Sequence, residues 1–236
     1  TDGRYFIQAA KQLEESTVEL MKMGEPGVPE MNAYIEKVLQ AGETLGFDGR
    51  VVSVGEGQGY ADIAAKKDAH VNYQEDLIDE IWSDRPAMSE EPAFDLDVKY
   101  AGETVADKLA RIRKEMKDAG ANTHVMTTLD DICWMLNIRG NDIDFFPMVL
   151  SYAIVTIDGV ELYIDERKLD DALKAKLAAD GVKLHPYNDI YEDIKKLDAS
   201  ETALIDPMKM NYALYKNIPC KIVEAANPTI LMKAMK

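Results

Sequence analysis

The chain has 236 residues, enough to bury a sizeable core and to form one or two domains. Its formal net charge of −16 argues against nucleic acid or an anionic membrane surface as a partner, because both need a basic surface. No apolar run approaches the roughly 18 residues of a membrane-spanning helix, so composition favours an acidic, soluble, globular protein.

The first half of the chain predicts alternating helices and strands, from apolar residues at helical spacing and from short β-branched runs. We expect helices at residues 3–15, 29–42, 59–67 and 74–82, and strands at residues 18–23, 50–54 and 70–73. Residues 55–59 (Gly-Glu-Gly-Gln-Gly) occupy the place of a phosphate-binding loop. They lack the Lys-Ser/Thr of such a loop, and Glu56 would repel an anion, so we expect a simple turn.

A predicted linker separates the two halves. Residues 83–91 contain Pro86 and end in two adjacent acids just before Pro92. Such a segment interrupts regular secondary structure. We therefore place one domain at residues 1–90 and a second at residues 91–236.

The second half opens with a helix that Thr104 caps and Gly120 ends. Further helices are expected at residues 166–180, 188–197 and 210–217, with strands at residues 124–126, 182–185, 203–205 and 220–223 and a last apolar turn at residues 228–235.

The central stretch, residues 128–165, is the most informative. Thr128 and Asp131 are spaced to cap a helix, which then becomes apolar on every side and so belongs inside a domain. Two β-branched and aromatic runs follow, separated only by Asp158-Gly159. This pair predicts a β-hairpin in which both turn residues take positive φ.

The two halves can be superimposed as copies of one α/β unit. Asp2 and Asp165 begin the same strand-to-helix corner, and Tyr60 and Tyr212 fall in the same order of elements. The second copy has an opening helix, strand, helix and hairpin before its corner, and the first copy has almost nothing. An incomplete first copy would leave an open sheet edge, so we expect a missing segment or another chain to complete it.

The cysteines and histidines predict structural roles. Cys133 and Cys220 form neither a disulfide framework nor a metal-binding spacing, so we interpret them as buried thiols in a reducing, cytoplasmic compartment. His70, His124 and His185 lie far apart in short strand-like runs without ligand spacing.

An acidic group allows two interpretations. Asp130, Asp131, Asp142 and Asp144 have the oxygen ligands that Mg or Mn prefers. Asp130 and Asp131 also lie in the first turn of a helix, where acids offset the exposed N–H groups. We favour helix capping over a metal site and assign no catalytic or metal-binding residue.

Arginines at the ends of elements are better candidates for function. A guanidinium at such a corner can fork onto carboxylates or carbonyls. We consider two roles for these side chains: internal bracing or domain docking, and contact with a partner domain or peptide. The candidates are Arg4, Tyr5, Trp82, Arg85 and Arg139.

Five segments, in this order, resemble the N-terminal half of the aminopeptidase P family, the Xaa-Pro aminopeptidases of the creatinase/prolidase superfamily. They are TDGRYFIQAAKQ (residues 1–12), LMKMG (20–24), IWSDRP (81–86), ADKLARIRKEM (106–116) and LDDICWMLNIRGND with SYAIVT (129–142 and 151–156). The resemblance implies two similar creatinase/prolidase N-terminal-type domains, each a mixed sheet flanked by helices, of which the first is incomplete here.

Members of that family remove the N-terminal residue that precedes proline, with two divalent metal ions, usually manganese, in a C-terminal pita-bread domain. The resemblance therefore implies a non-catalytic N-terminal region that serves dimerisation and substrate access in a parent metallopeptidase. Implied partners are the catalytic domain, a second copy in a homodimer, and a peptide with proline at position 2. The alternative is a peptide-binding module of a superfamily member that does not cleave, and a third is a hydrolase built on the four aspartates.

Overall fold

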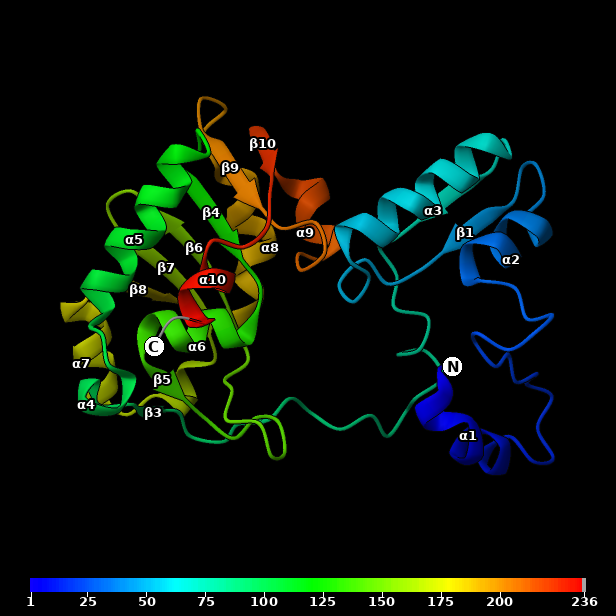
Figure 1. Ribbon diagram of the computed structural model, residues 1–236, viewed down its shortest axis with the longest axis horizontal. Coiled ribbons are helices and arrows are strands. Elements are labelled where there is room, and N and C mark those ends of the chain that lie inside the picture. Colours follow the sequence, from blue (N-terminus) through cyan, green and yellow to red (C-terminus); the bar gives the residue numbers. More distant parts are fainter. Residues whose placement is uncertain (235–236) are drawn as a thin grey trace. The chain divides into compact units, whose positions relative to one another are not determined.

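The computed structural model describes residues 1–234 and separates into two compact units. The first unit comprises residues 1–46 and 58–72, and the second comprises residues 47–57 and the described chain from residue 73 onward. Both are α/β units with their elements labelled in Figure 1. The predicted boundary at residue 90 and the two-copy repeat stay predictions.

The first unit is small. It contains the elements η1 (Gly3–Tyr5), α1 (Phe6–Gln12), α2 (Met31–Val38), β1 (Thr44–Gly46) and β2 (His70–Asn72) and the end of α3 (Val54–Lys66). β1 and β2 pair in parallel, with Leu45 opposite Val71. Leu39, Ile63 and Ala64 form its small buried core.

The second unit is built on a mixed six-stranded sheet in the order β10-β9-β4-β6-β7-β8. β4 pairs antiparallel with β6, β6 antiparallel with β7, and the remaining neighbours pair in parallel. The strands are β4 (Thr123–Met126), β6 (Ser151–Thr156), β7 (Val160–Ile164), β8 (Val182–His185), β9 (Thr202–Ile205) and β10 (Lys221–Glu224). The sequence predicted a mixed sheet, and this is confirmed.

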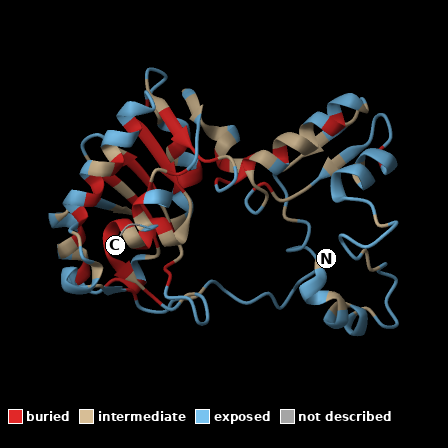
Figure 2. Cartoon of the chain, in the orientation of Figure 1, coloured by how far each residue is buried: buried red, intermediate tan, exposed pale blue. Residues whose placement is uncertain are grey.

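Helices cover both faces of this sheet (Figure 1), because its strands alternate between two apolar clusters. One cluster packs under α5 (Val105–Asp118), α6 (Leu129–Leu136) and α7 (Asp171–Ala179), and the other under α8 (Ile190–Asp193) and α9 (Tyr212–Asn217). Buried residues follow the sheet strands and α6 (Figure 2). None of the helices in residues 1–234 is long and apolar enough to cross a membrane.

The remaining elements of the second unit are short. A two-stranded ribbon pairs β3 (Phe94–Asp95) with β5 (Ile138–Arg139). The short helices are α4 (Val98–Ala101), η2 (Glu166–Lys168), η3 (Tyr187–Asp189), η4 (Ile194–Lys196) and α10 (Thr229–Ala234). The helix predicted at residues 166–180 is thus interrupted after Lys168, and the apolar turn predicted at residues 228–235 ends outside the described residues.

Most local signals in this unit are confirmed. Thr104 caps α5 by accepting the N–H of Asp107, and Gly120 follows the helix with a φ of +74°. The hairpin also forms, but residues 158 and 159 are absent from the positive-φ positions of the described chain, so the predicted turn geometry is wrong. Thr156 closes the loop instead: its Oγ1 accepts the N–H of Gly159 at 3.0 Å, and its N–H donates to the Gly159 carbonyl.

The predicted strand at residues 50–54 and turn at residues 55–59 are both wrong. Residues 50–52 form a turn, and α3 begins at Val54 and runs through the glycines. Ser53 and Glu56 make a capping box, in which Ser53 Oγ accepts the N–H of Glu56 and the Glu56 carboxylate accepts the N–H of Ser53. These two side chains satisfy N–H groups at the start of the helix, which overrides the weak helix propensity of glycine.

Two other predicted elements of the first half are wrong. Residues 18–22 are irregular, and the backbone of residues 21–23 pairs with Thr1. Residues 74–82 form no helix: residues 77–81 are turns, in which the Asp76 carboxylate accepts the N–H groups of Ile78 and Asp79. An aspartate that bonds its own backbone in this way competes with helix formation.

Candidate functional site

The four aspartates of the acidic group divide into separate networks. Asp131 is 2% exposed at the start of α6, where it accepts hydrogen bonds from Asn227 and Thr229, both at 2.5 Å, and from Thr128. Lys233 of α10 forms ion pairs with Asp130 and Asp131. The Thr128 side chain therefore makes no cap bond to the helix backbone, and the network joins α6 to α10.

Asp142 belongs to a different network. Its carboxylate accepts from Nζ of Lys168 at 2.6 Å and from the N–H of Leu150 at 2.7 Å. Both charged side chains are fully enclosed. Asp144, two residues further on, is exposed.

Bonds from lysines, amides and hydroxyls thus occupy the carboxylates of Asp130 and Asp131 and one oxygen of Asp142. Across residues 1–234, no three His, Cys, Asp or Glu side chains gather in a way that could hold a metal ion. The described residues consequently do not fit a di-metal centre, and no chemical step on this chain can be derived through one.

The three histidines lie in three different places. His124 is buried in β4, with Nδ1 donating to the carbonyl of Leu204 at 2.9 Å and Nε2 enclosed without a hydrogen-bond partner. Burial lowers the pKa of His124, which keeps the ring neutral. His185 contacts Glu161 at 2.6 Å, and His70 is exposed in β2.

Arg4 and Tyr5 lie in the first unit. The Arg4 guanidinium bonds the Asp2 carboxylate at 2.8 Å and lies 5.5 Å from the centroid of the Tyr5 ring. Asp2 is thereby the N-cap of η1 and also the partner of Arg4. Tyr5 is 47% exposed, so this corner presents an aromatic side chain at the surface.

Trp82, Arg85 and Arg139 lie in the second unit. Arg85 binds Asp76 at 2.5 Å and lies 5.7 Å from the Trp82 ring, which holds the predicted linker segment together. Arg139 donates to the carbonyl of Cys133 at 2.8 Å, at the end of α6. These contacts are local, and a docking or peptide-contact role for the five residues stays a prediction.

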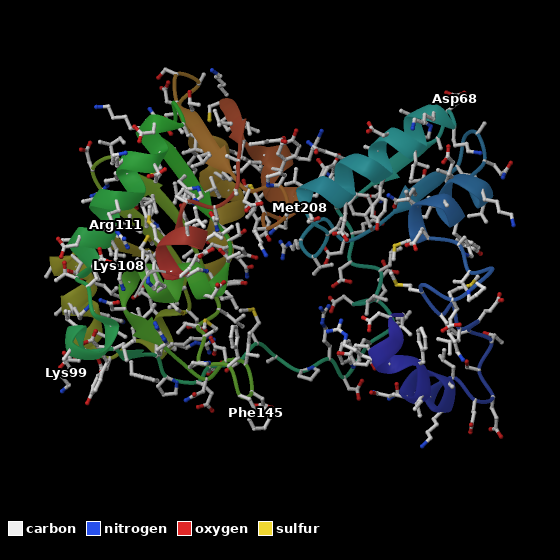
Figure 3. The ribbon with its side chains drawn as sticks, in the orientation of Figure 1. Asp68, Lys99, Lys108, Arg111, Phe145 and Met208 are labelled. Atoms are coloured by element: carbon white, nitrogen blue, oxygen red, sulfur yellow. The ribbon has the colours of Figure 1, made fainter. Side chains whose placement is uncertain are left out.

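Lys108, a buried lysine on α5, was not predicted from the sequence; Figure 3 labels it. Lys108 donates to the carbonyl of Trp134 at 2.8 Å and to Oδ1 of Asn137 at 2.5 Å, and lies 4.7 Å from the Trp134 ring. Arg111 lies 5.7 Å from the same ring. Burial lowers the pKa of Lys108 to about 8. The place of Lys108 on the apolar stripe of α5 was the sequence signal that could have identified it. Lys108 caps the end of α6, where Asn137 takes the left-handed conformation.

The second unit also contains a cavity of about 700 Å³ that no sequence motif indicated. Four tyrosines, Tyr73, Tyr152, Tyr187 and Tyr191, line it, together with Arg50 and other charged side chains. The Arg50 guanidinium lies 4.5 Å from the Tyr191 ring centroid, a cation–π distance. A cavity of this size is a candidate binding site, and its described lining holds no group of residues that could bind a metal ion.

Comparisons with known proteins agree with this architecture. Residues 84–236 match the family model of the creatinase/prolidase N-terminal domain. The chain belongs to that family. Its sequence corresponds to the N-terminal part of Xaa-Pro aminopeptidases.

Three relatives illustrate the likeness. The chain is 39% identical over 202 residues to a probable Xaa-Pro aminopeptidase P of Coprinopsis cinerea, covering 85% of this chain and 32% of that protein. It is 38% identical over 218 residues to aminopeptidase P2 of Arabidopsis thaliana, covering 91% and 31%. The crystal structure of X-prolyl aminopeptidase from Caenorhabditis elegans, described as a cytosolic enzyme with a di-nuclear active site, matches with a TM-score of 0.89 and 31% identity over 97% of this chain and 39% of that one. The chain spans about a third of the length of the curated relatives.

Proposed function

We propose that this chain is the non-catalytic N-terminal region of a metal-dependent Xaa-Pro aminopeptidase that removes the residue before proline. The observation that supports this most is the 0.89 TM-score match over 97% of this chain and only 39% of the Caenorhabditis elegans enzyme. In that protein the di-nuclear site accompanies a chain much longer than the matching part. The two metal ions, usually manganese in this family, would polarise the scissile carbonyl and activate water in a separate C-terminal pita-bread domain.

We assign dimerisation and control of substrate access to the two creatinase-type domains, at residues 1–90 and 91–236. Arg4, Tyr5, Trp82, Arg85 and Arg139 are the side chains that we expect at contacts with the catalytic domain, the second subunit or the peptide. The aromatic rings of Tyr5 and Trp82 support this role, since they are 47% and 45% exposed.

A cytoplasmic location fits the same proposal. Cys133 and Cys220 are both free, and Cys133 is buried with its pKa raised to about 11 by burial. Cys220 is only partly buried, so the prediction of two buried thiols is wrong for Cys220. Free, unreactive buried thiols are typical of proteins in a reducing compartment. The related Caenorhabditis elegans enzyme is described as cytosolic.

The alternative function is a peptide-binding module of a family member that does not cleave peptides. The tyrosine-lined cavity of the second unit is the observation that favours it. The two functions differ in one feature of the whole protein. A peptidase must also carry the Asp, Asp, His, Glu, Glu ligand set of the family's catalytic domain, and a binding module lacks it.

The test compares the full-length polypeptide with its catalytic region alone. Removal of the region described here should convert a dimer into a monomer in sedimentation and raise the relative rate of cleavage of long Xaa-Pro peptides over tripeptides. Arg85→Met in the full-length protein should shift the same ratio, and Lys216→Met, at an exposed position of α9, should not. An unchanged oligomeric state and length preference after removal would overturn the assigned role.

A further inference from the structure

The cavity lined by tyrosines has a wall that is fixed in place by backbone contacts. Residues 47–55, which carry Arg50, are bonded to the start of α9: the N–H of Ala213 donates to the carbonyl of Gly49 at 2.8 Å, and the N–H of Tyr212 donates to the carbonyl of Val52 at 2.9 Å. A Cβ on Gly49 would lie 2.7 Å from the carbonyl oxygen of Tyr73 and 3.2 Å from Cβ of Ala213. Only glycine allows this close approach, so the position of Arg50 is determined by the fold.

Arg50 differs from the other cations that line the cavity. Arg85 is paired with Asp76 and Asp79, and Lys195 is paired with Glu192 at 2.6 Å. Arg50 forms no ion pair with any residue in 1–234. Its charge faces the ring of Tyr191 and an open cavity.

Tyrosine side chains lie next to Arg50. Nδ2 of Asn211 donates to the Tyr191 hydroxyl at 3.2 Å, and the Tyr191 and Tyr152 hydroxyls share a hydrogen bond at 3.3 Å. The rings of Tyr152 and Tyr187 pack with their centroids 5.0 Å apart. Tyr187 also lines the cavity, so its hydroxyl is a donor that a ligand can use.

Burial raises the pKa of all three tyrosines, so the hydroxyls keep their protons at neutral pH. The cavity therefore offers a guanidinium and neutral hydroxyl donors beside tyrosine rings. A charged donor with a neutral one beside it is the arrangement that binds carboxylates.

We propose that this cavity binds a carboxylate, with Arg50 as the ionic partner and the Tyr187 hydroxyl as the second donor. The carboxylate can belong to a peptide C-terminus or to a small organic acid, and the aromatic walls contact the body that carries it. This goes beyond a role in dimerisation and does not depend on peptidase activity.

Four carboxylates also line the cavity, and they limit its affinity. Asp76 and Asp79 share the single positive charge of Arg85, and Glu192 is paired with Lys195. Asp48 accepts the backbone N–H of Arg50 at 2.8 Å. With these charges nearby, and few donors in an open site, we expect a dissociation constant of about 1 mM for a short peptide.

The test is an NMR titration of the full chain with N-acetyl-Ala-Pro-Pro and with the C-terminal amide of the same peptide. The free acid should bind at least tenfold more tightly than the amide. Propanoate identifies the source: comparable binding of propanoate assigns the site to small acids, and binding of the peptide alone assigns it to peptide C-termini.

Two variants locate the site. Arg50→Met keeps the aliphatic stem over Tyr191 and removes the charge, and Tyr187→Phe keeps the ring and removes the donor. Each should weaken binding of the acid at least tenfold, whereas Lys216→Met, which removes one positive charge from α9 outside the cavity, should not. The proposal is overturned if acid and amide bind equally, if neither the peptide acid nor propanoate binds at up to about 10 mM, or if both variants bind the acid as the unchanged chain does.

Discussion

Lys168 and Asp142 form an ion pair that is closed to solvent on both sides, with Nζ and Oδ2 2.6 Å apart. The pair joins η2 to the loop before β6, and Oδ2 also accepts the N–H of Leu150. The second oxygen, Oδ1, is buried without a hydrogen-bond partner. A buried charge that loses its partner lowers the free energy of unfolding. The stability of the loop before β6 therefore depends on the ion pair with η2.

Lys168→Met should therefore lower the free energy of unfolding by about 3–5 kcal/mol, because it leaves the Asp142 carboxylate buried and unpaired. The double variant with Asp142→Asn should cost less than Lys168→Met alone. Lys174→Met is the matched control, since the side chains of Lys174 and its partner Glu166 are 36% and 48% exposed, and solvent-accessible pairs contribute less than about 1 kcal/mol. Urea denaturation measures all three, and equal effects of Lys168→Met and Lys174→Met would contradict the account.

Asp131 should control stability at acid pH. Burial alone would raise its pKa, but donors from Lys233, Thr128 and Thr229 outweigh burial, and the pKa is lowered. Its stabilising contribution is complete above the ordinary pKa of 3.8 and is lost as pH falls through the lowered value. Asp131→Asn should cost about 2–4 kcal/mol at neutral pH and give a shallower loss of stability below about pH 4.

The measurement is urea denaturation at a series of pH values. Asp158→Asn, in the exposed loop between β6 and β7, serves as the control and should keep the acid-limb slope of the unchanged chain. An Asp131→Asn protein with that same slope would refute the role of Asp131.

Lys108 should change the free energy of unfolding at alkaline pH. Because burial lowers its pKa from 10.5 to about 8, the unfolded chain binds more protons than the folded one between these values. The contribution of this group to the free energy of unfolding therefore rises with pH from about 8 to about 10.5, by at most about 3 kcal/mol. Lys108→Met should lack that rise, and Lys117→Met, at an exposed position of the same helix, should keep it. A rise that survives in Lys108→Met would show that another group causes it.

Two glycines of α3 should respond in opposite ways to alanine. A Cβ on Gly57 would lie 2.5 Å from Cγ of Tyr212, so Gly57→Ala should destabilise the protein by about 1–3 kcal/mol. A Cβ on Gly59 would meet only Nδ2 of Asn32 at 3.7 Å, and Gly59→Ala should stabilise by up to about 1 kcal/mol through helix propensity. Thermal unfolding measures both, and the same sign of effect for the two variants would count against the close approach of Tyr212.

The same pair of glycines explains where prediction from sequence failed. Repeated glycines at residues 55–59 indicate a turn by propensity, but the Ser53–Glu56 capping box and the approach of Tyr212 keep them helical. The capping box was visible in the sequence and was overlooked. In contrast, α5 carries helical periodicity and the Thr104 cap, and β6 and β7 are two β-branched runs, so the helix and the pairing of the two strands were predicted correctly although the turn geometry was not.

The site residues were harder to predict because their partners are distant in sequence. Asn227 bonds Asp131 across 96 positions, and Tyr152 meets Tyr191 across 39. No local pattern indicates such contacts, since they depend on how the strands are ordered in the sheet. The sequence could therefore identify the aspartates as a group. It could not show that Asp130 and Asp131 pair with Lys233 and that Asp142 pairs with Lys168.

The central claim, that this chain is an accessory region without its own chemistry, is tested most directly by a peptidase assay. The purified chain is incubated with an Ala-Pro-Pro peptide and excess Mn²⁺, and release of alanine is followed against a protein-free control. The account predicts no release above the control. Release that is abolished by a chelator and persists through further purification, and that falls in Asp131→Asn or Asp142→Asn, would contradict it and place a metal site among the acidic residues.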